Sequence, residues 1–171
     1  MGQSSATFFD ELKEWSERKL RLLRNYIDGA TRILGTIDHV YYVDGFAGRG
    51  TYGRDNENQV PGSPIRAALL ARQYKNEGRA YSLSCINVEN NRDTFDELQS
   101  ATEPYRDVVK NLFGPFIDNV DAILKIVGDN PVICFLDPFG IDGMDMSGIE
   151  KLMRRETEPV SSLARKRLLR N

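Results

Sequence analysis

The sequence predicts an α/β fold in which a mostly parallel sheet is covered by helices on both faces. Apolar runs of strand length alternate along the chain with segments whose apolar residues recur at helical spacing. Such alternation is typical of parallel strands joined by crossover helices. The first and fourth apolar runs also end in aspartates, Asp44 and Asp137, which glycine and proline follow directly. These turn residues indicate that both runs are strands that end at a turn.

The bulk composition indicates one domain with no general attraction for nucleic acid. The chain has 171 residues, 40% of them hydrophobic, and a formal net charge of −2, whereas nucleic-acid binding usually relies on a basic surface. Cys85 and Cys134 lie in apolar runs, and we expect them to be core residues in a reducing, cytoplasmic setting, without a disulfide or a metal. No apolar run approaches the ~20 residues of a membrane span, and the opening MGQSSAT does not resemble a signal peptide.

Three segments are expected along the chain. Residues 1–36 form a helical extension, with Ser5 or Thr7 as a cap and Gly29 as a candidate break. Residues 37–158 form the sheet domain, and residues 159–171 form a basic tail, irregular or helical. The apolar stripe of the leading helix consists of Phe8, Phe9, Leu12, Trp15, Leu22, Leu23, Tyr26, Ala30, Ile33 and Leu34. Its other face, which includes Lys19, is either solvated or contacts a substrate phosphate.

The first half of the sheet domain contains two expected strands and one helix. A compact apolar run at residues 39–43 predicts the first strand, and residues 54–60 form a polar loop. Ser63 is suited to cap the next helix, Pro64 to its first turn, and Gly78 to its end. The second strand is expected at residues 81–89, where apolar and small residues alternate up to Glu89.

The second half adds two strands and three helices. Asn90 or Asn91 can cap a short helix that Pro104 must end. Residues 107–113 predict a weaker third strand, and residues 132–137 a strongly apolar fourth one. Ser147 can cap a last helix. The helical apolar positions are Phe95 and Leu98 in the short helix, and Ile117, Val120, Ile123, Leu124 and Val127 before Gly128.

Three carboxylates are expected on one edge of the sheet. The carboxyl ends of parallel strands share an edge, and ligands bind there in open α/β sheets. Asp44, Glu89 and Asp137 close the first, second and fourth strands. This edge is therefore the predicted ligand site.

The glycines after the first strand allow two interpretations. Residues 48–53 are a literal G-x-G-x-x-G, the pattern of a dinucleotide-binding turn. In that fold, however, the last glycine packs inside a helix and the ribose-binding acid follows ~20 residues later. Here a polar loop follows Gly53, and Glu89 lies 89 − 53 = 36 residues on. The stretch from Asp44 to Gly50 therefore suits a different nucleotide-like cofactor better.

S-adenosylmethionine fits these residues. Gly48 and Gly50 lack side chains, so a cofactor can lie directly against backbone amides. Asp44 can attract a positive group, and the sulfonium and amino-acid arm of this cofactor supply such groups. Its ribose hydroxyls suit Glu89.

The combination D-G-F-A-G-x-G-x-Y at residues 44–52, P-G-S-P at 61–64 and L-D-P-F-G at 136–140 resembles the three-Cys-motif partner (TcmP) protein family. The resemblance spans about residues 12–158 and includes the leading helix with Trp15, Lys19 and Tyr26. It implies a Rossmann-like class I methyltransferase fold, truncated after the fourth strand and helix. It also implies a cofactor turn containing Asp44, Gly45, Phe46, Gly48 and Gly50, with Glu89 on the ribose. The family name refers to a cysteine motif in a partner protein, so the resemblance also implies a three-Cys-motif protein as a partner.

Asp137, Pro138 and Phe139 indicate the reaction. They resemble the D/N-P-P-Y/F/W motif of amino-group methyltransferases, with one proline fewer. Asp137 and the Pro138 carbonyl can accept hydrogen bonds from the attacking amine, and Phe139 can stack on a planar group such as a nucleobase. A tight turn without catalytic function is the alternative. His39, Arg49 and Arg66 are weaker candidates, expected at the surface.

The chain departs from a complete methyltransferase pattern after residue 158. No further apolar strand follows, and residues 151–171 carry seven basic and two acidic side chains. This tail is either a nucleic-acid contact or a truncated end. In the strand order 3-2-1-4 the fourth strand is an exposed edge, so we expect marginal stability or self-association. Three functions remain open: an amino-group methyltransferase acting on DNA or RNA, a non-catalytic partner subunit of a three-Cys-motif protein, and a dinucleotide oxidoreductase that uses NAD(P) or FAD.

Overall fold

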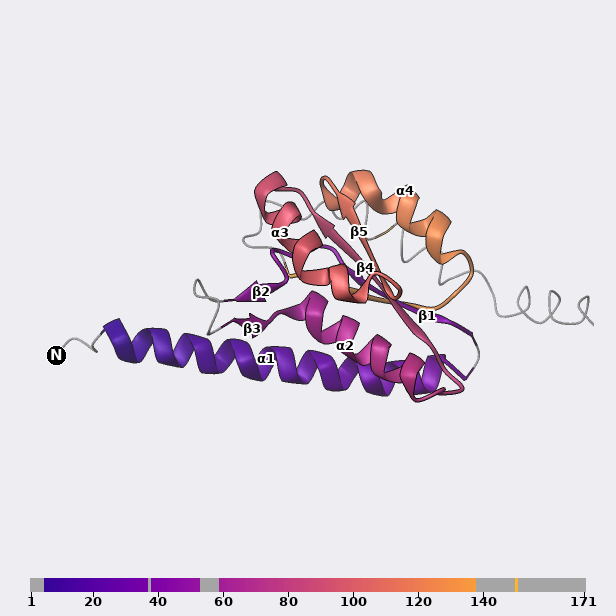
Figure 1. The fold of residues 1–171 in the computed structure, drawn as a ribbon, viewed down its shortest axis with the longest axis horizontal. Coiled ribbons are helices and arrows are strands. Elements are labelled where there is room, and N and C mark those ends of the chain that lie inside the picture. Colours follow the sequence, from indigo (N-terminus) through magenta and orange to yellow (C-terminus); the bar gives the residue numbers. More distant parts are fainter. Residues whose placement is uncertain (1–4, 37, 53–58, 138–149, 151–171) are drawn as a thin grey trace, which may run out of the picture.

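The computed structural model describes residues 5–36, 38–52, 59–137 and 150, with side chains from residue 17 onward. Its centre is a four-stranded sheet in the order β5-β4-β1-β6, and every neighbouring pair in it is parallel. Across the sheet, these are the third, second, first and fourth of the strands expected from the sequence, so the 3-2-1-4 order is confirmed. Helices flank the sheet (Figure 1), which is consistent with a Rossmann-like fold.

The elements follow the expected alternation closely. The helices are α1 (Ser5–Leu34), α2 (Ser63–Asn76), α3 (Arg92–Thr102) and α4 (Phe116–Val127), with a 3-10 turn, η1 (Glu103–Tyr105), after α3. The sheet strands are β1 (Val40–Asp44), β4 (Leu83–Glu89), β5 (Val109–Phe113) and β6 (Val132–Phe135). Asn91 caps α3 as expected, since its side-chain oxygen accepts a hydrogen bond from Thr94 N at 3.0 Å. Ser147 and the expected last helix lie almost wholly outside the described residues.

Each face of the sheet has its own core. Tyr42 on β1 and Cys85 on β4 pack with Leu70 and Tyr74 of α2 and with Ile27 of α1. Val43 and Ile86, the next residues along the same strands, pack instead against α4. Successive residues of a strand point to opposite faces, so β1 and β4 are buried on both sides.

Helix α1 differs from the single apolar stripe expected for it. It continues through Gly29 without a break and packs against α2 (Figure 1). Ile27 is fully buried, whereas Leu22, Tyr26 and Ile33 are 69%, 65% and 72% exposed. The stripe therefore spans two faces of the helix, and only one of them contacts the domain.

Three further expectations are corrected. A small antiparallel hairpin, β2 (Thr51–Tyr52) with β3 (Val60–Pro61), lies where only a loop was expected. Gly62, not Ser63, is the cap residue of α2. Cys134 is exposed because it lies on β6, the outer strand of the described sheet, while Cys85 is buried as expected.

Two isoleucines of α1 provide a matched test of how this helix docks. Replacing Ile27 by Ala should lower the free energy of unfolding by about 2–4 kcal/mol, because it leaves a cavity in a core. Replacing Ile33 by Ala should change it by less than about 0.5 kcal/mol, because that side chain is already in water. Urea unfolding followed by circular dichroism measures both, and equal effects would contradict this docking.

Candidate binding site at the carboxyl edge of the sheet

The three expected carboxylates lie on one edge of the sheet. Asp44 ends β1 and is in register with Asn87 on β4, two residues before Glu89. It is also in register with Phe135 on β6, two residues before Asp137. The negative charge of Asp137 contributes to raising the pKa of Asp44, as expected for acids at the same edge.

The turn after β1 is held by backbone hydrogen bonds to both neighbouring strands. Gly45 N donates to the Phe135 carbonyl of β6, and Ala47 N donates to the Val88 carbonyl of β4, each at 3.0 Å. Gly48 has a φ of +62°, and a Cβ built on it would meet no atom within 4 Å. A left-handed glycine beside open space is the geometry that lets a ligand reach the backbone.

The other two glycines of the turn face protein. A Cβ on Gly45 would lie 2.4 Å from Leu136 Cδ2, and one on Gly50 would lie 3.3 Å from Ala101 Cβ of α3. Gly45 therefore permits close packing beneath the turn. Gly50 borders the site, but a side chain at this position would point toward α3.

Glu89 fastens this turn to the next helix. One of its carboxylate oxygens accepts a hydrogen bond from Gly48 N at 2.9 Å, and the other accepts one from Asn91 N at 2.8 Å. An ionised carboxylate offers about four acceptor positions, so about two remain available. Because Glu89 also lines the adjacent pocket, these positions can receive hydroxyl donors from a ligand.

The pocket has a volume of about 330 Å³, which is in the range of small-ligand sites. The glycine turn forms one side of it, and the β2–β3 hairpin and the start of α3 form the others. Its lining residues are Phe46, Ala47, Gly48, Arg49, Gly50, Thr51, Tyr52, Gly62, Glu89 and Thr94. Two aromatic rings, a glycine backbone and one carboxylate thus surround the same space.

Tyr52 is a lining residue that the sequence did not single out as part of the site. Its ring packs near Gly62, since a Cβ on that glycine would lie 3.2 Å from Tyr52 Cε2. The pKa of the Tyr52 phenol is raised, first by burial and then by the negative charges of Asp44 and Asp137. The hairpin therefore brings this ring toward the acidic edge of the sheet while leaving it 47% exposed.

Asp44 lies beneath the pocket and does not line it. Its carboxylate is fully buried, accepts hydrogen bonds from Tyr42 Oη at 3.1 Å and Phe46 N at 3.3 Å, and is bonded to the Ser63 side chain. Burial raises the pKa of Asp44 to about 6, although these three hydrogen bonds oppose the shift. The expected direct contact between Asp44 and a cofactor is therefore not possible in this pocket. When ionised, Asp44 instead places a negative charge beneath the turn.

Asp137 forms an ion pair with Lys19 of α1, with 2.5 Å between Lys19 Nζ and Asp137 Oδ2. The two side chains are 34% and 49% exposed, and the ammonium also lies 5.8 Å from the centre of the Phe135 ring. Lys19 was expected on a solvated or phosphate-contacting face, so this contact is new. Pro138 and Phe139 lie outside the described residues.

The weaker candidates lie apart from the pocket or support its walls. His39 bonds Ser82 and Ser84 through its two ring nitrogens, at the start of β1 and β4. Arg66 Nε donates to the Pro61 carbonyl at 2.8 Å and so holds the hairpin. Arg49 pairs with Glu97 at 3.3 Å. The described part of the chain contains no group of three or more acidic, histidine or cysteine residues suited to a metal.

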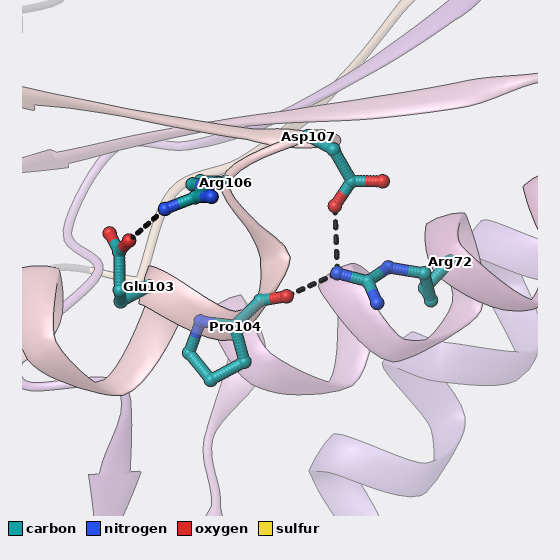
Figure 2. Close-up of a pocket in the computed structure, with 5 residues that line it drawn as sticks. All are labelled: Arg72, Glu103, Pro104, Arg106 and Asp107. Atoms are coloured by element: carbon teal, nitrogen blue, oxygen red, sulfur yellow. Dashed lines mark hydrogen bonds and ion pairs between the residues drawn. The ribbon is translucent and has the colours of Figure 1, made fainter.

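A second hollow, of about 490 Å³, lies between α2 and η1 (Figure 2). Its charged groups already bond one another: Arg72 donates to the Pro104 carbonyl and pairs with Asp107 at 2.7 Å, and Arg106 pairs with Glu103 at 2.8 Å. Lys75 also reaches Asp107. These ion pairs join α2 to the chain leading into β5, so we interpret the hollow as a structural contact.

Comparison with protein-family models, with curated proteins and with solved structures found no match to this chain. Within the described residues, no helix has the length and apolar character needed to cross a membrane. The assignment of function therefore depends on the geometry of the pocket.

The buried carboxylate gives a pH-dependent prediction. Asp44 has a pKa of about 6 against an ordinary 3.8, so the folded protein favours its protonated form. Its contribution to stability is complete below pH ~4 and is lost as the pH rises through ~6, a change of about 3 kcal/mol. Asp44→Asn stays neutral and should not show this loss.

Urea unfolding of both proteins between pH 4 and pH 8 measures the effect. The stability of Asp44→Asn relative to the wild type should increase by about 3 kcal/mol between pH 4 and pH 7. Other titrating groups cancel in this difference. A difference that is independent of pH would show that Asp44 is not buried as described.

Proposed function

We propose that this chain is an S-adenosylmethionine-dependent methyltransferase of the amino-group type, with a nucleobase in DNA or RNA as the acceptor that fits best. The observation that carries the proposal is the pocket between Gly48 and Glu89. It combines an open glycine backbone with a carboxylate at the carboxyl ends of adjacent parallel strands. Nucleotide-like cofactors bind at this place in open α/β sheets.

The residues present suit this cofactor. The two remaining acceptor positions of Glu89 match the two hydroxyls of a ribose. Phe46 and Tyr52 offer aromatic surfaces for a purine, and Thr94 a hydroxyl at the start of α3. Asp44, when ionised, places a negative charge under the turn and so favours a cationic ligand above it. When bound, S-adenosylmethionine supplies a methyl group on a sulfonium.

Asp137 is the proposed acceptor-side residue. Its carboxylate can accept a hydrogen bond from an amine N–H and so direct the nitrogen lone pair, which gains rate by orientation alone. Lys19 Nζ lies 2.5 Å from Asp137 Oδ2, so the other carboxylate oxygen is the one proposed to accept. For the two following residues the proposal rests on the sequence: the Pro138 carbonyl accepts a hydrogen bond from the amine, and Phe139 stacks on a planar acceptor.

The path of the chain after the turn disfavours a dinucleotide oxidoreductase. That class needs the helix to begin at the last glycine of the fingerprint, so that its N-terminus meets the pyrophosphate. Here the chain enters β2 directly after Gly50, and α2 begins only at Ser63. The helix is therefore displaced from the glycines by the whole hairpin.

A non-catalytic partner subunit of a three-Cys-motif protein is the second candidate. The ion pair between Lys19 and Asp137 favours it, because the ammonium competes with an amine substrate for the same carboxylate. In this case the pocket would bind the cofactor without methyl transfer.

Calorimetric titration with S-adenosylmethionine, its demethylated product and NAD tests the cofactor. We expect the first two to bind, and Glu89→Gln to weaken both by roughly 10- to 100-fold, because hydrogen bonds to a charged acceptor are lost. Glu103→Gln is the matched control. It removes the same charge from a residue that pairs with Arg106, and neither of these two residues lines the pocket, so it should leave affinity within about twofold. Binding of NAD alone would overturn the proposal.

A methyl-transfer assay separates the enzyme from the partner subunit. Labelled methyl donor is incubated with the chain and with DNA, RNA or protein, alone and with a three-Cys-motif protein. Asp137→Ala should lose at least about tenfold in transfer while binding the cofactor normally. Cofactor binding with no transfer to any acceptor would support the non-catalytic role.

A further inference from the structure

We propose that the exposed face of α1, formed by Leu22, Tyr26 and Gly29, binds a second copy of this chain as an antiparallel helix pair. No residue of this surface lines the cofactor pocket or belongs to the outer strand of the sheet. Three kinds of observation lead to it: the side chains that α1 leaves in water, the position of its first half, and the distribution of its charges.

The exposed apolar side chains are concentrated on one helix. Of the six exposed large hydrophobic residues in the described part of the chain, Leu22, Tyr26 and Ile33 lie on α1. With Gly29 they are spaced by four, three and four residues, which is the a/d spacing of helices that pack along a seam. A Cβ on Gly29 would meet nothing within 4 Å, so a second helix can approach closely there.

The first half of α1 extends beyond the rest of the domain (Figure 1). Isolated helices of this length are marginal in water, and most helical stability comes from packing one face. Residues 8, 12 and 15 continue the same a/d spacing in the sequence. The apolar a/d positions of the sequence therefore run along both halves of α1, interrupted at Lys19, which pairs with Asp137.

The charges of α1 select the antiparallel orientation and the second copy as partner. Residues 10–17 contain four acidic residues and one basic residue, whereas residues 18–24 contain four basic residues and no acidic one. A parallel pair would oppose like charges, and an antiparallel pair opposes unlike ones. Because the same helix supplies both halves, the surface is complementary to itself, as a twofold interface requires.

The charge boundary also sets the register. The twofold axis passes near residue 17, so residue 12 lies opposite residue 22 and residue 8 opposite residue 26. Gly29 lies opposite Ser5, the first residue of α1, so the overlap ends there. Each projecting first half then covers the exposed face of the other copy. The two sheet domains lie at opposite ends of the pair.

Sedimentation equilibrium over a range of chain concentrations tests the association. The wild type should dimerise, more tightly at low salt, and Tyr26→Glu should raise the dissociation constant at least about tenfold. Leu69→Glu is the control, since Leu69 is an exposed leucine of α2, and it should change the constant less than about twofold. A wild type that is monomeric throughout overturns the proposal. So does a dimer that Tyr26→Glu leaves unchanged, because association would then occur through another surface.

Cysteine cross-linking tests the orientation. In a Cys134→Ser background, Arg18→Cys and Asn25→Cys place a thiol on the same side of α1, seven residues apart. In the proposed pair the two copies of residue 18 are about 3 Å apart along the axis, and those of residue 25 about 24 Å apart. A short bis-maleimide should therefore join only Arg18→Cys chains. Joining at both positions would indicate a parallel pair, and joining at neither a different interface; both results contradict the proposal.

Discussion

The arrangement of the carboxyl edge depends on one buried group, the carboxylate of Asp44. Its partners come from three elements: Tyr42 from β1, Phe46 from the turn, and Ser63 from the start of α2. A buried carboxylate without partners is costly, so these elements must meet around it. That meeting fixes the turn, and the turn then brings Gly48 N to Glu89. The pocket is a consequence of satisfying one charge below it.

The same requirement explains how much of the fold could be predicted. β1 and β4 are buried on both faces, so their apolar runs in the sequence predict strands, and the helices between them follow from spacing and caps. Helix α1 was harder, because apolar residues cover more than one face of it. Helical periodicity cannot tell which of two apolar faces is buried, so Ile27 was missed and Ile33 was assigned to the stripe. The β2–β3 hairpin has only two residues per strand, too few to show alternation.

At the candidate site, the placement of the three carboxylates could be predicted from the sequence, but their side-chain contacts could not. Strand ends placed Asp44, Glu89 and Asp137 on one edge because topology alone decides it. The buried carboxylate of Asp44 is hydrogen-bonded to Ser63, which the sequence indicated only as a helix cap. Lys19 and Asp137 are 118 residues apart, and no local pattern connects a lysine in a charged helix to an aspartate after a strand.

Helix α1 connects the candidate site to the exposed surface. Lys19 contacts Asp137, while Leu22 and Tyr26, within two helical turns of it, face water. An ion pair as exposed as this one contributes at most about 1 kcal/mol, since water screens it. A second helix over residues 19–26 would remove part of that water and strengthen the attraction between the two charges. Association through α1 and the strength of the Lys19–Asp137 ion pair are therefore coupled.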